Sequence, residues 1–318
     1  MGERILAVRL GAMGDVIHAL PAVASLKSSF AGSRVAWVVE PRWAVLLDGN
    51  PYVDEVVQLN RREWRSVRAA WSRLRAMRID RAVDFQGLIK SALVARASGA
   101  RRICGYDRDG VREKAAVWFY TDARPVEAAH VVDRHLELAA RCGAVARRAV
   151  FPLPEGSIEG ELPAEFVLAS PFAGWPSKEW PLERYGELAR ILRRSCGMPL
   201  VLNGHPAAEA ALRGVEDAVP HVCSISGLIS ATRRARAVVG VDSGPLHLAA
   251  ALGKPGVAIY GPTDPLRNGP YGGSIRVLRA RDAVTSYKRR RETDPSMMAI
   301  TPRAVAAELE QCLAGGPV

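Results

Sequence analysis

The sequence contains no CxxC pair, no long apolar run and no recognisable leader. Its few cysteines are odd in number and scattered: Cys104, Cys142, Cys196, Cys223 and Cys312. This pattern indicates neither a disulfide framework nor a zinc site, and it favours a reducing, cytoplasmic location. No apolar stretch reaches the roughly 20 residues that a membrane-spanning helix needs. The chain passes from Met1 straight into a strand-like segment, without the architecture of a signal peptide.

Low-complexity tracts and nucleic-acid-binding signatures are also missing. No zinc finger, helix-turn-helix pattern or RNA-binding fingerprint is present, so we expect no nucleic-acid partner. Apolar residues make up 48% of the chain and charged residues 24%, which is typical of a globular protein. A length of 318 residues allows two domains, each with its own core.

Positive charge is abundant and unevenly placed. The formal net charge is +11, and the segment 61–80 carries seven arginines against Glu63 and Asp80. Such a segment attracts a nucleic acid, an acidic membrane surface or a phosphorylated substrate. A solvated helix face explains the charge equally well. Trp43, Trp64 and Trp71 lie near the segment and allow contact with a membrane surface.

Strand-like and helix-like segments alternate along both halves of the chain. The first half predicts strands over 5–10, 34–39, 53–59, 81–84 and 101–104, with helices over 16–28, in the arginine-rich segment and over 88–97. The second half predicts strands over 166–170, 200–203, near 222, before 242 and over 256–260, with helices over 182–194, after 206, from 243 and over 302–313. A Pro/Gly/Glu-rich stretch over 151–163 is the expected linker. We therefore predict an α/β fold of two Rossmann-like, doubly wound domains, 1–160 and 161–318, that face a central cleft. The last helix is a candidate to pack back on the first domain.

The most informative stretch covers residues 239–265. It reads as a strand, a turn of small residues, a helix whose first turn presents Ser243, Gly244 and His247, and a second strand. Ligands of open α/β sheets bind at the carboxyl ends of the strands, and a helix amino terminus suits a diphosphate. The stretch therefore predicts a nucleotide or nucleotide-sugar site. Asp242 is either a helix cap or a partner for sugar hydroxyls, and His247 is either a ligand contact or a core residue.

Two other turns carry candidate groups. The turn over 11–15 lacks the GxGxxG pattern, so a dehydrogenase is only weakly indicated. Asp15 is either a helix cap or a general base for an attacking hydroxyl, and His18 is either a wall of the cleft or a satisfied helix histidine. In the turn over 171–181, Lys178 precedes a helix and is placed to neutralise a phosphate, although a lone lysine there is usually a surface residue.

Five segments, taken in order, resemble the lipopolysaccharide heptosyltransferase family. They are residues 13–21, 84–92, 178–181, 242–247 and 260–265. The resemblance implies a GT-B fold and an inverting, metal-independent glycosyltransferase. It implies transfer of L-glycero-D-manno-heptose from ADP-heptose, the donor substrate, to a Kdo residue of the lipid A inner core, with no cofactor. It also implies a protein bound peripherally to the anionic cytoplasmic face of the inner membrane.

The same resemblance implies roles for individual residues. Asp15 would be the catalytic base, and Lys178 would stabilise the departing diphosphate. The donor would be bound by Ala173, Gly174, Glu209, Asp242, Ser243, Gly244 and His247. The acceptor would be bound by Gly14, His18, Arg61, Arg62, Arg65, Gln86, Arg112 and Arg134. Two departures from the family pattern stand out: only Glu209 is available for the adenosine ribose, and backbone N–H groups at Ala173 and Gly174 would have to replace hydroxyl side chains.

Three alternatives stay open. One is a related glycosyltransferase with a different core acceptor, and another is a GT-B nucleotide-sugar epimerase. The third is a basic binding module for nucleic acid or anionic lipid. That last alternative explains the charge but leaves Asp15, Lys178 and His247 without a role.

Overall fold

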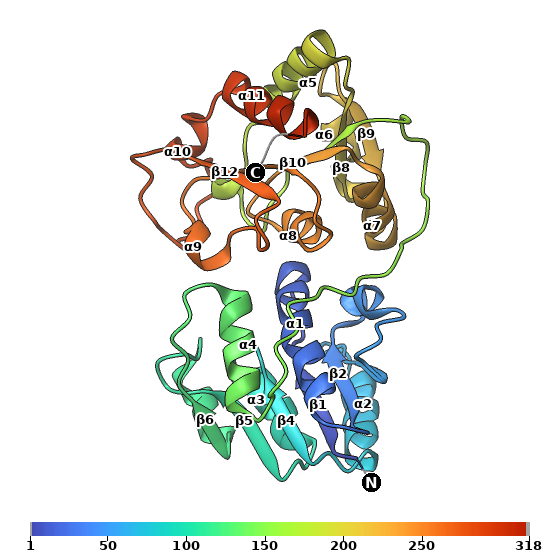
Figure 1. Cartoon of the computed structure of the whole chain (residues 1–318), viewed down its shortest axis with the longest axis vertical. Coiled ribbons are helices and arrows are strands. Elements are labelled where there is room, and N and C mark those ends of the chain that lie inside the picture. The colour runs from blue at the N-terminus through green and yellow to red at the C-terminus, as the bar shows by residue number, and fades with distance from the viewer. Residues whose placement is uncertain (1, 316–318) are drawn as a thin grey trace. The chain divides into compact units, whose positions relative to one another are not determined.

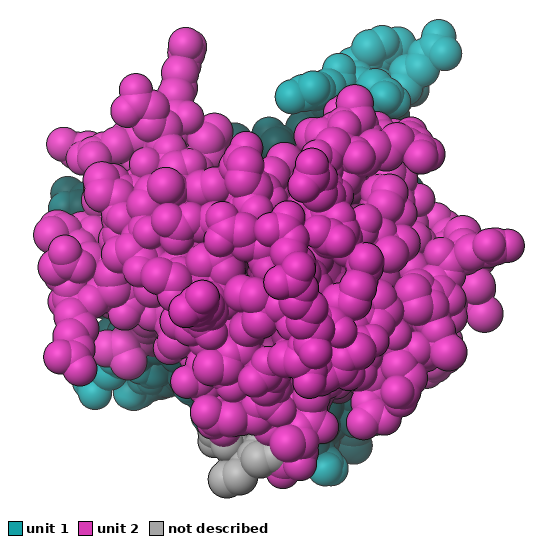
Figure 2. Space-filling view, turned by 90° about the horizontal axis from the view of Figure 1, so that it is seen from above, with its two compact units in different colours: residues 1–154 teal, residues 155–318 magenta. Residues whose placement is uncertain are grey.

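The chain folds into two compact units, residues 1–154 and 155–318 (Figure 2). The computed structural model describes residues 2–315. Within these residues each unit contains one six-stranded sheet, and all pairs of neighbouring strands are parallel. The predicted α/β class with two Rossmann-like sheets is confirmed (Figure 1). No helix of the described chain has the length and apolarity to cross a bilayer.

The first sheet has the strand order β3-β2-β1-β4-β5-β6. Its strands are β1 (Arg4–Val8), β2 (Arg34–Val39), β3 (Glu55–Gln58), β4 (Arg81–Asp84), β5 (Arg102–Tyr106) and β6 (Asp122–Arg124). Its helices are α1 (Met13–Ser29), α2 (Trp64–Ala76), α3 (Ile89–Ala97) and α4 (Val131–Arg141), with short 3-10 segments η1 (Pro41–Leu47) and η2 (Lys114–Phe119). The strand order reverses between β1 and β4, and ligands of such sheets bind at this point.

The second sheet has the order β12-β11-β10-β7-β8-β9. Its strands are β7 (Val167–Ser170), β8 (Leu200–Gly204), β9 (Val219–Val222), β10 (Ala237–Val241), β11 (Gly256–Tyr260) and β12 (Ile275–Arg279). Its helices are α5 (Leu182–Cys196), α6 (Glu209–Arg213), α7 (Ile225–Arg234), α8 (Gly244–Ala251), α9 (Pro265–Asn268), α10 (Pro295–Met298) and α11 (Pro302–Leu313), with η3 (Pro176–Lys178) and η4 (Pro206–Ala208). The equivalent reversal falls between β10 and β7.

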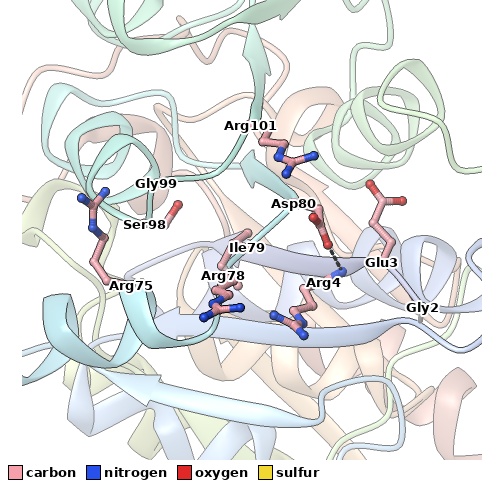
Figure 3. A pocket seen from close by; sticks show the side chains of 10 residues that line it. All are labelled: Gly2, Glu3, Arg4, Arg75, Arg78, Ile79, Asp80, Ser98, Gly99 and Arg101. Atoms are coloured by element: carbon pink, nitrogen blue, oxygen red, sulfur yellow. Dashed lines mark hydrogen bonds between the residues drawn. The ribbon is translucent and has the colours of Figure 1, made fainter.

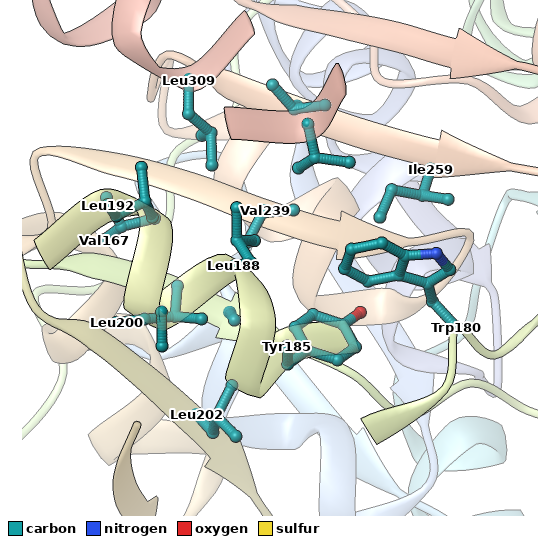
Figure 4. Packing of buried hydrophobic residues seen from close by; sticks show 14 of the residues in the cluster. Val167, Trp180, Tyr185, Leu188, Leu192, Leu200, Leu202, Val239, Ile259 and Leu309 are labelled. Atoms are coloured by element: carbon teal, nitrogen blue, oxygen red, sulfur yellow. The ribbon is translucent and has the colours of Figure 1, made fainter. Parts of the chain in front are cut away.

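The central strands are buried and largely apolar, as expected of parallel sheets that helices cover on both faces. In the second unit, Trp180 packs edge-on against Tyr185 with ring centroids 4.9 Å apart (Figure 4). The Trp180 indole N–H donates to the carbonyl of Ile300 at 3.0 Å, so the segment before α11 is tied to the core. Helix α11 packs on α5, β10 and β11, so its apolar face is filled within its own unit. Removing a buried tryptophan of this kind costs about 3–5 kcal/mol.

Six helices and strands were not predicted from the sequence: β6, α4, α7, β12 and the short helices α9 and α10. Helix α4 begins after His130, whose Nδ1 accepts the N–H of Val132 at 3.2 Å, and histidine is not a usual cap residue. Helix α1 begins at Met13 rather than near Val16. This earlier start places Asp15 in the first turn of the helix.

Candidate functional site

Asp15 follows the carboxyl end of β1 and lies in the first turn of α1. Its Oδ2 accepts the N–H of Ala12 at 3.1 Å, as the third residue of a capping box does. Its Oδ1 pairs with the guanidinium of Arg9, and the side chain is still 30% exposed. The carboxylate therefore supports the helix start and keeps an accessible face.

The charge state of Asp15 is set by its positive neighbours. Burial by itself raises the pKa of this carboxyl, but Arg9, Arg112 and the Ala12 N–H together hold the pKa below its ordinary value. The group is consequently ionised at neutral pH. An ionised carboxylate within reach of solvent is a form that can accept a proton from a hydroxyl.

Arg9 organises this turn and was missed by the sequence reasoning. One Nη donates to the carbonyl of Phe85 at 2.7 Å while the other meets Asp15, and the side chain is only 4% exposed. The indole N–H of Trp37 donates to the Arg9 carbonyl at 3.1 Å. A buried arginine needs a partner, so a charged residue at the end of an apolar strand was the available signal.

Gln86 has a structural task in the same unit. It is buried, and its Oε1 accepts the N–H of Leu10 at 2.9 Å, which ties the loop after β4 to the turn after β1. The loop itself is held by the buried Asp84 carboxylate, which accepts hydrogen bonds from Gln86 N, Gly87 N, Ser91 Oγ and Tyr120 OH. Burial raises the pKa of Asp84, and these four donors offset that rise only in part.

Positive side chains gather near this edge of the first sheet. Arg61 pairs with Glu40 at 2.8 Å. The backbone N–H of Arg112 donates to the carbonyl oxygen of Gly87. Gly87 has a φ of +68°, a conformation that favours glycine. Burial lowers the pKa of Lys90, and Arg61 and Arg112 lower it further. Lys90 lies in a segment that carries the family resemblance but was not among the predicted site residues.

The remaining predicted acceptor residues are more scattered. Gly14 is buried in α1, and His18 is 5% exposed, with its ring edge-on to His130. Arg134 is engaged by the loop before α4 and the 107–112 turn, since its guanidinium donates to the carbonyls of Ala128 and Gly110. Arg62 and Arg65 are exposed at the start of α2.

Lys178 and Asp242 form a buried ion pair in the second unit. The Lys178 Nζ lies 3.0 Å from the Asp242 Oδ2 and 2.6 Å from its backbone oxygen. The same Nζ lies 4.1 Å from the ring centroid of Trp175. His247 Nε2 is 3.4 Å from the other carboxylate oxygen of Asp242. Burial raises the pKa of Asp242, but His247 and Lys178 lower it to about 2.

The turn between β10 and α8 offers polar groups for an anion. Ser243 occupies the cap position of α8, yet its side chain makes no capping bond, and in the described structure its buried Oγ has no hydrogen-bond partner. An unsatisfied buried hydroxyl costs about 1–3 kcal/mol, which a ligand oxygen would remove. The first N–H groups of α8, beginning at Gly244, also lack partners within the helix. This arrangement suits a phosphate.

The other predicted donor positions differ in their availability. The Ala173 N–H already donates to Glu179 Oε1 at 3.0 Å, so it is not free for a phosphate as the sequence suggested. Gly174 is exposed, and a Cβ added there would meet nothing within 4 Å, which leaves its backbone open. Glu209 begins α6 and pairs with Arg213 at 2.7 Å, so a ribose would have to share it.

An arginine-rich pocket lies at the opposite edge of the first sheet (Figure 3). It has a volume of about 720 Å³ and surrounds the amino ends of β1 and β4, where the Arg4 N–H donates to Asp80 Oδ2 at 3.0 Å. Its lining residues are Gly2, Glu3, Arg4, Arg75, Arg78, Ile79, Asp80, Ser98, Gly99 and Arg101. Asp15 and Gln86 follow the carboxyl ends of the same strands, so this pocket is separate from them.

Comparisons with known proteins agree with the site's chemistry. The model of the family described as glycosyltransferase family 9 (heptosyltransferase) matches residues 67–297. A lipopolysaccharide heptosyltransferase 1 of Pseudomonas aeruginosa is 34% identical over 298 residues, covering 85% of this chain and 82% of that protein. The protein of the same name from Escherichia coli K12 is 31% identical over 307 residues, covering 87% and 93%.

Solved structures extend the likeness to both units. The E. coli heptosyltransferase WaaC with ADP has a TM-score of 0.79 and 28% identity, covering 97% of this chain and 99% of that chain. The E. coli ADP-heptose LPS heptosyltransferase II has a TM-score of 0.81 and 25% identity, covering 98% and 99%. These matches confirm the predicted GT-B architecture.

Proposed function

The chain belongs to glycosyltransferase family 9, the heptosyltransferases, and from this premise we propose that it transfers L-glycero-D-manno-heptose from ADP-heptose to a Kdo residue of the lipid A inner core. This is the reaction of a heptosyltransferase I in lipopolysaccharide biosynthesis. Relatives named lipopolysaccharide heptosyltransferase 1, and WaaC structures with ADP and with ADP-2-deoxy-2-fluoro heptose, support heptose transfer. The proposal rests on one observation. The ionised Asp15 follows β1, and the 242–247 turn, which has polar groups that can bind an anion, follows β10; both are central strands of a Rossmann-like sheet.

We assign the role of general base to Asp15. The acceptor hydroxyl oxygen attacks the anomeric carbon of the heptose, and the bond from that carbon to the diphosphate oxygen breaks. The hydroxyl proton passes to Asp15, which Arg9 keeps ionised and oriented. A single in-line displacement of this kind inverts the anomeric configuration. A positioned base typically contributes about 10²- to 10⁴-fold to the rate.

The departing diphosphate needs positive charge where its own charge develops. We assign this role to Lys178 and to the amino terminus of α8, with the Ser243 hydroxyl as a further donor. Gly174 would offer an open backbone N–H, and Glu209 the ribose contact. In this proposal the protein's own groups stabilise the leaving group, so transfer proceeds without a metal ion.

The acceptor is itself an anion, since Kdo carries a carboxylate and lipid A carries phosphates. Arg61, Lys90 and Arg112 are cationic groups of the unit that holds Asp15, and they complement such a ligand. Arg62 and Arg65 extend the positive surface onto α2. These residues favour an anionic acceptor, and transfer to a different anionic core sugar is the nearest competing function.

We further propose that one face of the first unit rests on the cytoplasmic side of the inner membrane. Trp64 and Trp71 on α2 are 67% and 54% exposed, and Val67 between them is 43% exposed. Trp118 of η2 is 80% exposed, and α3 packs on both α2 and η2. Exposed tryptophans interleaved with arginines are typical of surfaces that bind anionic lipid headgroups. The structure thus adds an apolar stripe to the basic segment read from the sequence.

Incubation with ADP-heptose and Kdo2-lipid A, followed by mass spectrometry of the acceptor, tests the reaction. We expect the acceptor to gain one heptose residue and ADP to accumulate in equal amount. An epimerase would instead isomerise ADP-heptose with no acceptor present, which an NMR time course detects. If Kdo2-lipid A stays unmodified while another core sugar gains a heptose, the protein is still a heptosyltransferase. The assignment of Kdo as its acceptor would then be wrong.

A further inference from the structure

We propose that Arg289 is a second cation for the diphosphate of the donor, carried by a basic strap formed by residues 286–294. The strap contains four consecutive basic residues, Lys288, Arg289, Arg290 and Arg291. The family resemblance gave them no role. This inference rests on the proposed function, because it adds a residue to the donor site.

The strap is fixed at both ends to the edge of the sheet that carries the donor turn. The N–H of Ser286 donates to the carbonyl of Pro262 at 2.7 Å, just after β11. The N–H of Asp294 donates to the carbonyl of Ser177 at 3.2 Å, in the turn after β7. Strand β10 lies between β11 and β7 in the sheet. The four basic residues therefore lie between two anchors that follow β11 and β7, the neighbours of the strand that Asp242 follows.

Arg289 and Lys178 share one aromatic ring. The guanidinium carbon of Arg289 lies 5.2 Å from the ring centroid of Trp175, and the Lys178 Nζ lies 4.1 Å from the same centroid. Cations favour the face of an indole, so Trp175 fixes the direction of the arginine. An anion beside Trp175 would be attracted by both cations.

Lys178 alone supplies only part of the positive charge that a diphosphate needs. Its ammonium has three hydrogens, and it makes two hydrogen bonds to Asp242, one to the carboxylate and one to the backbone oxygen. The buried pair is therefore close to neutral as a unit. Arg289 is exposed and, in the part of the chain that the structure describes, has no carboxylate partner. It is the group beside Trp175 whose charge is uncompensated.

The chemistry of arginine suits a phosphate group of the donor. A planar guanidinium binds phosphate oxygens through two parallel hydrogen bonds, which a lysine cannot do. The buried Ser243 hydroxyl, just after β10, makes no hydrogen bond in the described structure and is an independent sign of a site that can donate to a phosphate oxygen. We expect two cations, Lys178 and Arg289, to favour a nucleoside diphosphate over a monophosphate, because the second phosphate adds oxygens that the second cation can bind.

Calorimetric titration with ADP and with AMP tests this role. Arg289→Ala should weaken ADP binding by roughly tenfold or more, the usual effect of losing a charged hydrogen bond, and AMP binding by less than about twofold. Arg289→Lys should restore part of the ADP affinity. Arg281→Ala removes an exposed arginine outside the strap and should leave both affinities unchanged. Arg289 is exposed, so thermal melting should be the same for all four proteins.

Three results would overturn the proposal. They are an ADP affinity of Arg289→Ala within twofold of the wild type, an equal loss for ADP and AMP, and a loss confined to binding of phosphatidylglycerol vesicles. The last would make the strap a lipid contact. Wild-type turnover with ADP-heptose and Kdo2-lipid A is measured in parallel. A selective loss of ADP affinity in Arg289→Ala would support the role of Arg289 in diphosphate binding even if the wild type showed no turnover with these substrates. The two proposals can therefore fail separately.

Discussion

Lys178 donates to both the carboxylate and the backbone oxygen of Asp242, although both side chains are more than nine-tenths buried. The pair joins the turn after β7 to the end of β10, on either side of the point where the strand order reverses. A buried ion pair adds little to stability over an apolar pair of the same size, but breaking it is costly. We infer that the pair is kept for its site and not for the fold.

Asp242→Asn should destabilise the second unit by about 3–5 kcal/mol near neutral pH, because it leaves the Lys178 charge buried without a partner. The pKa of Asp242 is lowered to about 2 from an ordinary value of 3.8. The ionised Asp242 carboxylate therefore contributes fully to the free energy of unfolding at pH values above its ordinary pKa of 3.8, and this contribution is lost as the pH falls toward 2. Urea unfolding near pH 7 and near pH 3 should show a smaller difference between variant and wild type at the lower pH. An equal difference at both would contradict the ion-pair account.

His135 should make the first unit sensitive to mild acid. Burial, together with the positive charges of Arg9, Arg134, His130 and Arg112, holds the pKa of His135 well below 6.5. The folded state therefore keeps this ring neutral while the unfolded chain takes up a proton. Stability is lost as the pH falls below the unfolded value of about 6.5.

The matched variant for this prediction is His135→Phe, which cannot titrate. Its melting temperature should fall less between about pH 7.5 and pH 5.5 than that of the wild type. It also loses the hydrogen bond between the Tyr106 hydroxyl and His135 Nδ1, so the variant should be less stable at the higher pH. Parallel pH dependences for the two proteins would show that another group carries the effect.

Arg9→Lys should change the pH dependence of transfer. Lysine keeps one charge but cannot contact both the Phe85 carbonyl and Asp15 with two fixed nitrogens. Arg9 lowers the pKa of Asp15, so weakening that contact should raise it. The acid limb of kcat/KM should then shift to higher pH, with ADP affinity unchanged. An unshifted limb with a merely lower kcat would mean that Arg9 only supports the fold.

The exposed tryptophans of α2 should control membrane binding. Replacing Trp64 and Trp71 together by serine should reduce sedimentation with phosphatidylglycerol vesicles by roughly fivefold per residue, which corresponds to about 1 kcal/mol of apolar contact each. Val145→Ser removes another highly exposed apolar side chain of the same unit and should have no effect. Equal binding by the double variant would place the membrane contact elsewhere.

The sequence predicted the central elements well and the contacts poorly. The predicted bounds of β2, an apolar run, and of β4, a short buried strand, match the structure. Strand β12 was missed because most of its residues are only partly buried. Helix α4 was missed although Val132, His135, Leu136 and Ala139 recur at helical spacing on its buried face, so the signal was in the sequence. Likewise, Lys178 and Asp242 were assigned to one site through family resemblance, while their direct contact came only from the structure.

Arg9 and Ala173 show the same limit at the level of single groups. Nothing in the spacing of Arg9 and Asp15 announces an ion pair, because it depends on how α1 leaves the end of β1. The Ala173 N–H looked free in the sequence, whereas Glu179 occupies it in the folded turn. Individual hydrogen bonds of this kind follow from tertiary geometry, which local patterns do not encode.

Asp15 is assigned as the base for heptose transfer, and the turnover of Asp15→Asn tests this role. The amide keeps the size of the side chain but cannot take up the hydroxyl proton. With saturating ADP-heptose and Kdo2-lipid A we expect kcat to fall by about 10²- to 10⁴-fold, while ADP affinity stays close to wild type. The melting temperature should fall, because the nearly buried Arg9 loses its charged partner, so turnover is compared at a temperature at which both proteins are folded. Turnover within a few-fold of the wild type would show that Asp15 is not the base and that another residue accepts the hydroxyl proton.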